Sequence, residues 1–168
     1  MGGGRAAAGS LAFFVAGPGA VAALVPWLLT GWRAAAWVRG WLPLRIVGGL
    51  LIALGLAILV GAFARFVVEG RGTPLPVAAP DRLVVGGIYR HVRNPMYAGL
   101  VWIVAGQGLL LGQVVLLAYA LVVLGVTAAF VQWYEEPELA RRFGAQFAAY
   151  RRAVPGWWPR WRPWSPQG

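Results

Sequence analysis

Two polar clusters interrupt an otherwise apolar chain and hold side chains that could do chemistry. The first, at 89–99, reads YRHVRNPMYAG and precedes an apolar run; it contains two arginines and the only histidine of the chain. The second cluster follows another apolar run and reads YEEPELARRFGAQFAAYRRAVPGW. Its second and third residues are Glu135 and Glu136. If the two apolar runs pair as a hairpin, the clusters meet at one end of it. Together they would form a pocket for a ligand that carries both signs of charge.

Asn94 and Pro95 mark the expected start of a helix within the first cluster. Proline is favoured at the first helical position, where its missing N–H costs nothing, and asparagine is a common N-cap. The unpaired N–H groups and the dipole of such a helix end suit an anionic group. The alternative is that this step only starts a helix while Arg90 and Arg93 meet lipid phosphate.

Composition predicts a membrane protein. Of 168 residues, 60% are hydrophobic and 12% are charged, against about 25% charged in an ordinary soluble domain. Four apolar runs stand out, at 11–30, 46–68, 97–111 and 114–134, and about twenty residues cross a bilayer, so the third run is short. Only Gly112 and Gln113 separate the last two runs, which should form an antiparallel hairpin. The sequence therefore predicts an all-α polytopic membrane protein with about four transmembrane helices.

Glycines within these runs are expected to be packing residues. The second run contains GGLLIALG, and the third contains AGQG with Gly106 and Gly108. Small residues let helix backbones approach closely in a membrane. A nucleotide-binding loop would instead need a strand before it, and none is indicated.

Arginines set the expected orientation, because all fifteen basic residues are arginine. Eleven lie before the first run, between the second and third, or after the fourth; three lie between the first and second. The positive-inside rule then puts both termini and the 69–96 connection, with the active site, in the cytoplasm. After Pro137, apolar residues recur at helical spacing and predict a separate cytoplasmic amphipathic helix that lies on the membrane and covers the pocket. They are Leu139, Phe143, Phe147 and Tyr150.

We expect one membrane domain over residues 1–168, with no room for a separate soluble domain. It would comprise two N-terminal spans within 1–70, a functional region at 81–159 and an interfacial tail at 160–168. Tryptophans gather in the first connection and in PGWWPRWRPW near the C-terminus, as they do at membrane interfaces. The first run lacks a clear cleavage site and is expected to stay as an anchor.

Charge and composition also exclude several function classes. The formal charge of +10 favours anionic lipid headgroups or anionic ligands, so the lipid bilayer is the expected partner. Nucleic acid is not expected, because no basic face survives outside the apolar runs. The chain has no cysteine, which excludes disulfides and thiol nucleophiles, and its single histidine and five acids predict no metal site.

At the two polar clusters the sequence resembles the integral-membrane methyltransferases that include isoprenylcysteine carboxyl methyltransferase and phosphatidylethanolamine N-methyltransferase. The matching elements are LVVGGIYRHVRNPMYAG, the short glycine-containing run, YEEPEL and FGAQFAAYRRAVPGWWP, which fall in the right order within 81–159. The resemblance implies S-adenosylmethionine held between the last two spans and the surface helix, with a lipophilic acceptor entering from the bilayer. By position it assigns cofactor contacts to Asp81, Arg82, Leu83, Val84, Tyr89, Asn94, Pro95, Met96, Tyr97 and Glu135.

Two positions depart from the carboxyl methyltransferase pattern. Asn94 stands where that family has histidine, and Val131 stands where it has an arginine that holds the substrate carboxylate. The NPMY and YEEP elements stand as they do in phospholipid N-methyltransferases. The resemblance thus implies an isoprenylcysteine-type carboxylate or a phospholipid amine as the acceptor, and the sequence also leaves lipophilic hydroxyls and thiols open.

Methyl transfer from a sulfonium is an in-line displacement that requires alignment of donor and acceptor in a dry pocket. An amine acceptor must also lose a proton, which Glu136 or Tyr134 could receive. We expect Glu135 to position the cofactor and Glu136 to position the acceptor.

Two other functions compete with this interpretation. A membrane reductase that uses NADPH would explain the arginines through the phosphates of its cofactor. A non-enzymatic protein that binds anionic lipid would explain the arginines and tryptophans without a pocket. The sequence leaves open the identity of the acceptor, the role of His91 and the oligomeric state.

Overall fold

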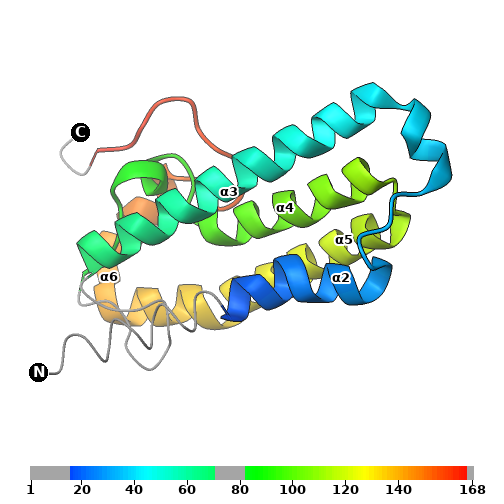
Figure 1. Cartoon of the computed structure of the whole chain (residues 1–168). Coiled ribbons are helices and arrows are strands. Elements are labelled where there is room, and N and C mark those ends of the chain that lie inside the picture. The colour runs from blue at the N-terminus through cyan, green and yellow to red at the C-terminus, as the bar shows by residue number, and fades with distance from the viewer. Residues whose placement is uncertain (1–15, 71–81, 166–168) are drawn as a thin grey trace, which may run out of the picture. The chain divides into compact units, whose positions relative to one another are not determined.

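A computed structural model describes residues 16–70 and 82–165, and within them the ordered elements are all helical (Figure 1). No strand occurs among these residues, so the all-α prediction is confirmed for them. In chain order the elements are η1 (Ala20–Leu24), α2 (Val25–Thr30), η2 (Ala36–Gly40), α3 (Leu42–Gly70), η4 (Gly87–Arg90), α4 (Pro95–Leu111), α5 (Val114–Phe130), η5 (Val131–Glu135) and α6 (Glu136–Ala153). The elements η1 and η5 are π-helical turns, and η2 and η4 are 3₁₀ turns.

The chain forms two compact units, each made of two stretches of sequence. Unit 1 consists of Met1–Leu56 and Gly99–Val123, and unit 2 consists of Ala57–Ala98 and Leu124–Gly168. The boundaries fall inside α3, α4 and α5. The single membrane domain over residues 1–168 and its expected subdivision stay predictions.

Two helices in the described ranges are long and apolar enough to cross a membrane. They are Leu42–Arg65 and Val114–Ala153, which includes α5, η5 and α6. Ala16–Thr30 and Pro95–Leu111 are shorter apolar helices. These four segments correspond in position to the four expected runs, although residues 11–15 of the first run lie outside the described residues.

Glycines allow α3 and α4 to touch backbone to backbone in unit 1. A Cβ on Gly48 would lie 2.7 Å from the carbonyl oxygen of Gly106, and a Cβ on Gly106 would lie equally close to that of Gly48. Seven residues along each helix the contact repeats, since a Cβ on Gly55 would lie 2.7 Å from the carbonyl oxygen of Gly99. The two helices thus run antiparallel with only hydrogen atoms between them, and the predicted packing role of these glycines is confirmed.

Pro26 explains the π-helical turn η1 and two side-chain contacts to it. The turn is closed by the N–H of Val25, which donates to the carbonyl five residues back, at Ala20. Because proline has no N–H, one acceptor before it, the carbonyl of Val21 five residues back or that of Ala22 four residues back, lacks a partner within the helix. Tyr119 Oη donates to the first at 3.1 Å, and Gln107 Nε2 donates to the second at 2.7 Å. Side chains of α4 and α5 therefore satisfy backbone groups that hydrocarbon could not.

Gly112 makes the tight turn between α4 and α5. Its φ of +66° lies in the left-handed region, and the N–H of Gln113 donates to the carbonyl of Gly108 at 2.9 Å. This six-to-one bond is a common way to end a helix after a left-handed glycine. Across the turn Gly108 packs against Leu117. The predicted hairpin is confirmed at its closed end.

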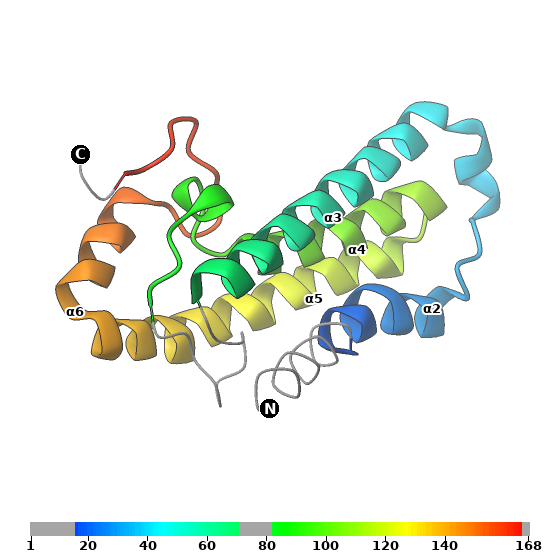
Figure 2. The same cartoon turned by 60° about the vertical axis from the view of Figure 1, so that its left-hand side comes forward.

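The helix after α5 does not break at Pro137 as expected. The π-helical turn η5 ends at Glu135, and α6 begins at the next residue with the proline in its first turn. The break lies instead at Gly144, whose φ of 48° and ψ of −120° are not helical, and in Figure 2 the orange α6 turns sharply partway along its length. Phe147 and Tyr150, beyond the break, belong to the predicted apolar stripe and are buried with Val154 against Leu83 and Val85. Leu139 and Phe143, before the break, pack on the same cluster.

Candidate functional site

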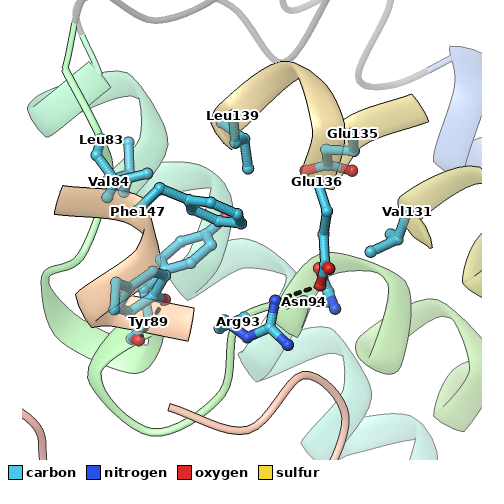
Figure 3. A pocket seen from close by; sticks show the side chains of 11 residues that line it. Leu83, Val84, Tyr89, Arg93, Asn94, Val131, Glu135, Glu136, Leu139 and Phe147 are labelled. Atoms are coloured by element: carbon cyan, nitrogen blue, oxygen red, sulfur yellow. Dashed lines mark hydrogen bonds and ion pairs between the residues drawn. The ribbon is translucent and has the colours of Figure 1, made fainter. Parts of the chain in front are cut away.

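Eleven side chains from three regions of unit 2 surround one pocket (Figure 3). The regions are the segment before α4, the turn η5 and both arms of α6. The lining residues are Leu83, Val84, Tyr89, Arg93, Asn94, Val131, Glu135, Glu136, Leu139, Phe147 and Tyr150. The wall is mostly apolar and aromatic, and its charged groups are one guanidinium and two carboxylates.

The carboxylate of Glu69, near the end of α3, holds the loop that supplies Leu83 and Val84. It accepts a hydrogen bond from the N–H of Gly86 at 2.9 Å and pairs with Arg65 at 3.2 Å. A Cβ on Gly86 would overlap that carboxylate. The next residue, Gly87, has a φ of +55°, which favours glycine. The GG step at 86–87 therefore lets the loop approach α3 closely.

Tyr89 forms part of the buried wall and remains a neutral phenol. It packs with Ala62 and Val84, and its backbone carbonyl accepts a hydrogen bond from Tyr150 Oη at 2.6 Å. Burial, together with the negative charge of Glu135, raises the pKa of Tyr89 well above its ordinary value. The residue can donate a hydrogen bond to a ligand but cannot serve as a base near neutral pH.

The π-helical turn η5 brings three residues to the same side of the chain. Its wider turn is closed by the N–H of Glu136, which donates to the carbonyl of Val131 five residues earlier. Val131, Glu135 and Glu136 consequently all line the pocket. A π-helical turn inside a longer helix is often found at functional sites.

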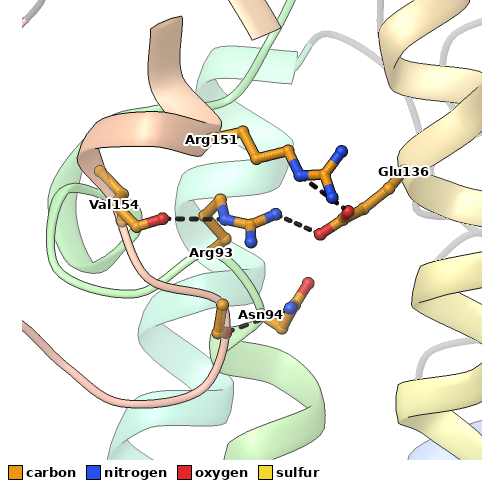
Figure 4. A network of polar contacts seen from close by, with 6 residues as sticks. Arg93, Asn94, Glu136, Arg151 and Val154 are labelled. Atoms are coloured by element: carbon orange, nitrogen blue, oxygen red, sulfur yellow. Dashed lines mark hydrogen bonds and ion pairs between the residues drawn. The ribbon is translucent and has the colours of Figure 1, made fainter. Parts of the chain in front are cut away.

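Glu135 and Glu136 have different surroundings. Glu135 accepts a hydrogen bond from Tyr97 Oη at 3.0 Å, and no cationic side chain of the described ranges pairs with it. Glu136 forms ion pairs with both Arg93 and Arg151, the latter at 3.2 Å (Figure 4). Among the described residues Glu135 therefore has no cationic partner, and burial raises its pKa above the ordinary value, whereas both oxygens of Glu136 are engaged.

Arg93 links the pocket to the end of α6 and to the chain that follows it. Its Nε donates to the carbonyl of Val154 at 2.9 Å, while its Nη1 binds Glu136. The side chains of Arg93 and Glu136 are only 14% and 13% exposed. Next to it, Asn94 Nδ2 donates to the carbonyl of Gly156 at 3.1 Å (Figure 4). The alternative in which Arg93 meets lipid phosphate differs from the structure, where Arg93 forms an internal ion pair.

The structure brings six of the predicted site residues together around this pocket. They are Leu83, Val84, Tyr89, Asn94, Glu135 and Glu136. Three more lie directly beside it: Pro95 begins α4 as predicted, Met96 packs against Val84 and Tyr89, and Tyr97 binds Glu135. The carbonyl of Asn94 accepts the first helical bond, from Ala98 at 3.1 Å, which places Asn94 at the N-cap position.

The remaining predicted residues do not line the pocket or cannot be placed. Arg82 is exposed. Tyr134 is 51% exposed, stacks on Phe130 with ring centroids 5.2 Å apart and is not among the residues that line the pocket. Asp81 lies outside the described residues.

Five lining residues were not among the predicted site residues. Phe147, Tyr150 and Leu139 had been assigned to an apolar stripe, and that stripe was the available signal for them. Arg93 directly precedes Asn94, and Val131 lies one turn before Glu135, so their positions in sequence could have indicated them. Among the described residues, no group of three or more His, Cys, Asp or Glu side chains is placed to hold a metal ion.

Comparison with known proteins adds a family match that includes most of this site. Residues 44–146 match the model of a family described as phospholipid methyltransferase. Protein-S-isoprenylcysteine O-methyltransferase B of Arabidopsis thaliana is 37% identical over 75 residues, which are 44% of this chain and 38% of that protein. Its relative A from the same plant is 40% identical over 73 residues, 43% of this chain and 36% of that protein. The matched segment thus spans well under half the length of either relative. No solved structure matches the chain.

Proposed function

This chain belongs to the phospholipid methyltransferase family, and from that premise we propose that it transfers a methyl group from S-adenosylmethionine to a lipophilic acceptor at a membrane. The proposal includes four transmembrane helices, with both termini and the pocket on the cytoplasmic side. The distribution of arginines along the chain supports that orientation. The apolar helices of the described ranges support the membrane location.

One observation carries the proposal: Glu135 is a carboxylate in a largely apolar pocket, and its only side-chain partner among the described residues, Tyr97, is neutral. A carboxylate so placed attracts a cation strongly, because little water screens its charge. S-adenosylmethionine carries a sulfonium and an ammonium group, and either would complement Glu135. The residues present therefore fit this cofactor.

The other lining residues can be assigned to the remaining parts of the cofactor. When bound, S-adenosylmethionine supplies an electrophilic methyl group. The first turn of α4, after Asn94 and Pro95, presents backbone N–H groups to a carboxylate. Tyr89 and Phe147 supply aromatic surface for adenine. The chain's own contribution is then to align donor and acceptor and to exclude water.

An amine acceptor fits the charges of the pocket better than a carboxylate acceptor. Two carboxylates and one guanidinium line the wall, and Arg93 is already paired with Glu136. Val131 offers no positive charge to an incoming carboxylate. We therefore favour a phospholipid amine over an isoprenylcysteine-type carboxylate. For Glu136 to position that acceptor or receive its proton, Arg93 or Arg151 must release one of its oxygens; for Tyr134 to do so, its ring must leave Phe130.

The test is transfer of a radiolabelled methyl group from S-adenosylmethionine by the full chain reconstituted in vesicles of a total lipid extract, with a total protein extract added. We expect label in the amine-containing phospholipids, and none when Glu135 is replaced by glutamine. Label in a protein fraction as a base-labile ester would identify a carboxylate acceptor instead. Equilibrium binding of NADPH without binding of S-adenosylmethionine would identify a reductase. Binding of neither, with salt-sensitive lipid binding retained, would leave the non-enzymatic alternative.

A further inference from the structure

The segment after α6, residues 155–164, is held to the pocket wall by its backbone. We call it the tail segment, and the chain at 90–94 the turn segment. Its hydrogen bonds to the turn segment are Arg93 N to Pro155 O at 2.9 Å, Asn94 N to Gly156 O at 3.1 Å, Arg160 N to His91 O at 2.9 Å, Trp164 N to Arg90 O at 3.0 Å, Arg90 Nε to Trp164 O at 2.6 Å and His91 Nδ1 to Arg160 O at 2.8 Å. His91, whose role the sequence left open, thus serves to hold the tail segment. The path of this segment is set by the fold.

Two large aromatic rings nevertheless point away from the protein. Trp158 is 79% exposed and Trp161 is 98% exposed, whereas Trp164 packs on Tyr150 with centroids 5.4 Å apart. A protein surface in water seldom presents neighbouring indole rings in this way without a partner. The exposed rings therefore indicate a surface that a partner covers.

The charge around these rings indicates which kind of partner would bind there. Between residues 155 and 165 the chain has two arginines and no acidic residue. Arg162, next to Trp161, is exposed, and so is Arg152 at the end of α6; the side chain of neither forms an ion pair with any residue that the structure describes. Indole rings favour the interface between water and hydrocarbon, and arginines favour anionic headgroups.

We propose that the tail segment docks on a membrane surface that contains anionic lipid, with Trp158 and Trp161 inserted among the headgroups and Arg162 beside phosphate. This inference rests on the proposed membrane location but not on methyl transfer. Because the same segment is bonded to the turn segment, docking also holds Arg93 and Asn94 at the membrane surface. The pocket wall and the lipid surface are then connected through one rigid stretch of backbone.

The absence of cysteine from the chain allows a site-specific test. Pro159 lies between the two exposed tryptophans and is itself exposed. The full chain with Pro159→Cys, carrying a nitroxide label, would be reconstituted in vesicles of phosphatidylcholine with phosphatidylglycerol, and in phosphatidylcholine alone. The measurement is the collision rate of the label with oxygen, which partitions into lipid, and with a water-soluble nickel chelate. Val122→Cys, in α5 and also exposed, provides a reference for a label in hydrocarbon.

In the vesicles that contain phosphatidylglycerol, we expect the label at 159 to collide several-fold less often with the nickel chelate when both tryptophans are present than when the chain also carries Trp158→Ser and Trp161→Ser. Shielding should weaken in phosphatidylcholine alone, because Arg162 then lacks anionic partners. Since both rings are exposed, these substitutions remove no internal packing; circular dichroism checks the helix content. Trp161→Ser alone serves if the double variant does not fold.

If the label at 159 collides with the nickel chelate at the same rate in the chain with both tryptophans and in the serine variant, the proposal is overturned. Equal shielding on both lipids would overturn the choice of anionic headgroups. Shielding of the label in detergent that grows with protein concentration would show a second copy of the chain as the occupant, which also overturns it. If the label at 122 is open to nickel in vesicles, the proposed membrane location itself is wrong, and the two failures are thereby distinguished.

Discussion

The hydroxyl of Tyr97 donates a hydrogen bond to the carboxylate of Glu135 across 3.0 Å. Tyr97 lies in the first turn of α4, and Glu135 ends the π-helical turn that follows α5. This bond joins residues 38 apart in the sequence, so the two polar clusters meet within unit 2 as the hairpin predicts. Asn94, just before Tyr97, lines the same pocket as Glu135, and one small molecule can contact both.

Replacing Glu135 with glutamine should weaken binding of S-adenosylmethionine. The substitution keeps the shape of the side chain but removes the negative charge that faces the pocket. A hydrogen bond or contact to a charged group contributes about 1.5–3 kcal/mol, which corresponds to roughly a 10- to 100-fold loss of affinity. Equilibrium binding in detergent measures it. Glu138→Gln, in the first turn of α6 and outside the pocket, is the control and should bind normally; unchanged affinity in Glu135→Gln would contradict the assigned role.

The ion pair between Arg93 and Glu136 should stabilise the fold asymmetrically. Glu136→Gln leaves Arg93 without any carboxylate among the described residues, and an unpaired buried charge costs about 3 kcal/mol. Arg93→Met should cost less, because Glu136 retains Arg151. Thermal unfolding in detergent of both single variants and the double variant would measure the coupling.

The pair Glu138 and Arg141 provides the matched control for that experiment. Its side chains are 35% and 78% exposed, so its removal should change stability by less than about 1 kcal/mol. Equal losses from the two pairs would show that burial does not determine their contributions.

Gly48→Ala should destabilise the packing of α3 against α4, because its Cβ would meet the backbone of Gly106. Overpacking of this kind costs about 1–3 kcal/mol. Gly49→Ala changes the next residue of the same helix, where a Cβ would meet nothing within 4 Å. The midpoint of thermal unfolding should therefore fall in Gly48→Ala but not in Gly49→Ala. Equal midpoints in the two variants would refute the close backbone contact.

Gln107→Leu should lower stability by about 1 kcal/mol or more, because the carbonyl of Ala22 is left without a donor where Pro26 cannot supply one. Gln113→Leu removes a similar bond of 2.7 Å, to the carbonyl of Arg33, at an exposed site where water can replace it. Resistance to proteolysis in detergent, read alongside the unfolding midpoint, compares the two. A larger loss from the Gln113 variant would argue against the role of Gln107.

Tyr89 should make stability fall at alkaline pH. Its pKa is raised in the folded state by burial and by Glu135, so the neutral phenol is favoured there. Unfolding releases the proton once the pH exceeds the ordinary value of about 10, and stability is lost as pH rises further. Tyr89→Phe should show a shallower decline in unfolding midpoint over this alkaline range. Near neutral pH, the pH dependence of cofactor binding should be the same in both proteins; a change there would mean that Tyr89 titrates during function.

Several features of the fold follow from short-range signals in the sequence. Pro95 begins α4 because a proline is tolerated where no N–H partner is needed, and Gly112 ends it because a left-handed conformation is required there. The glycines at 48, 55 and 106 indicate close helix packing for the same local reason, the lack of a side chain. These signals also brought Asn94 and Glu135 into one predicted site, since a hairpin forces its two open ends together.

Other features depend on contacts between residues far apart in the chain. The turn η5 rotates the helix, and this rotation decides whether Arg93 binds lipid phosphate or Glu136. It also decides whether Tyr134 faces the pocket or Phe130. A one-residue change in helical register of this kind is not visible in hydrophobic periodicity. The break at Gly144 was likewise missed, because a glycine can continue a helix or end it, and burial of Phe147 and Tyr150 against Leu83 selects the second. The sequence by itself determined the apolar segments, their ends and the residues available for a charged ligand, because these depend on nearest neighbours. Which carboxylate pairs with arginine could be read only from the folded chain, because it depends on where the arginines come to lie: Glu136 pairs with Arg93 and Arg151, and Glu135 pairs with no arginine of the described ranges.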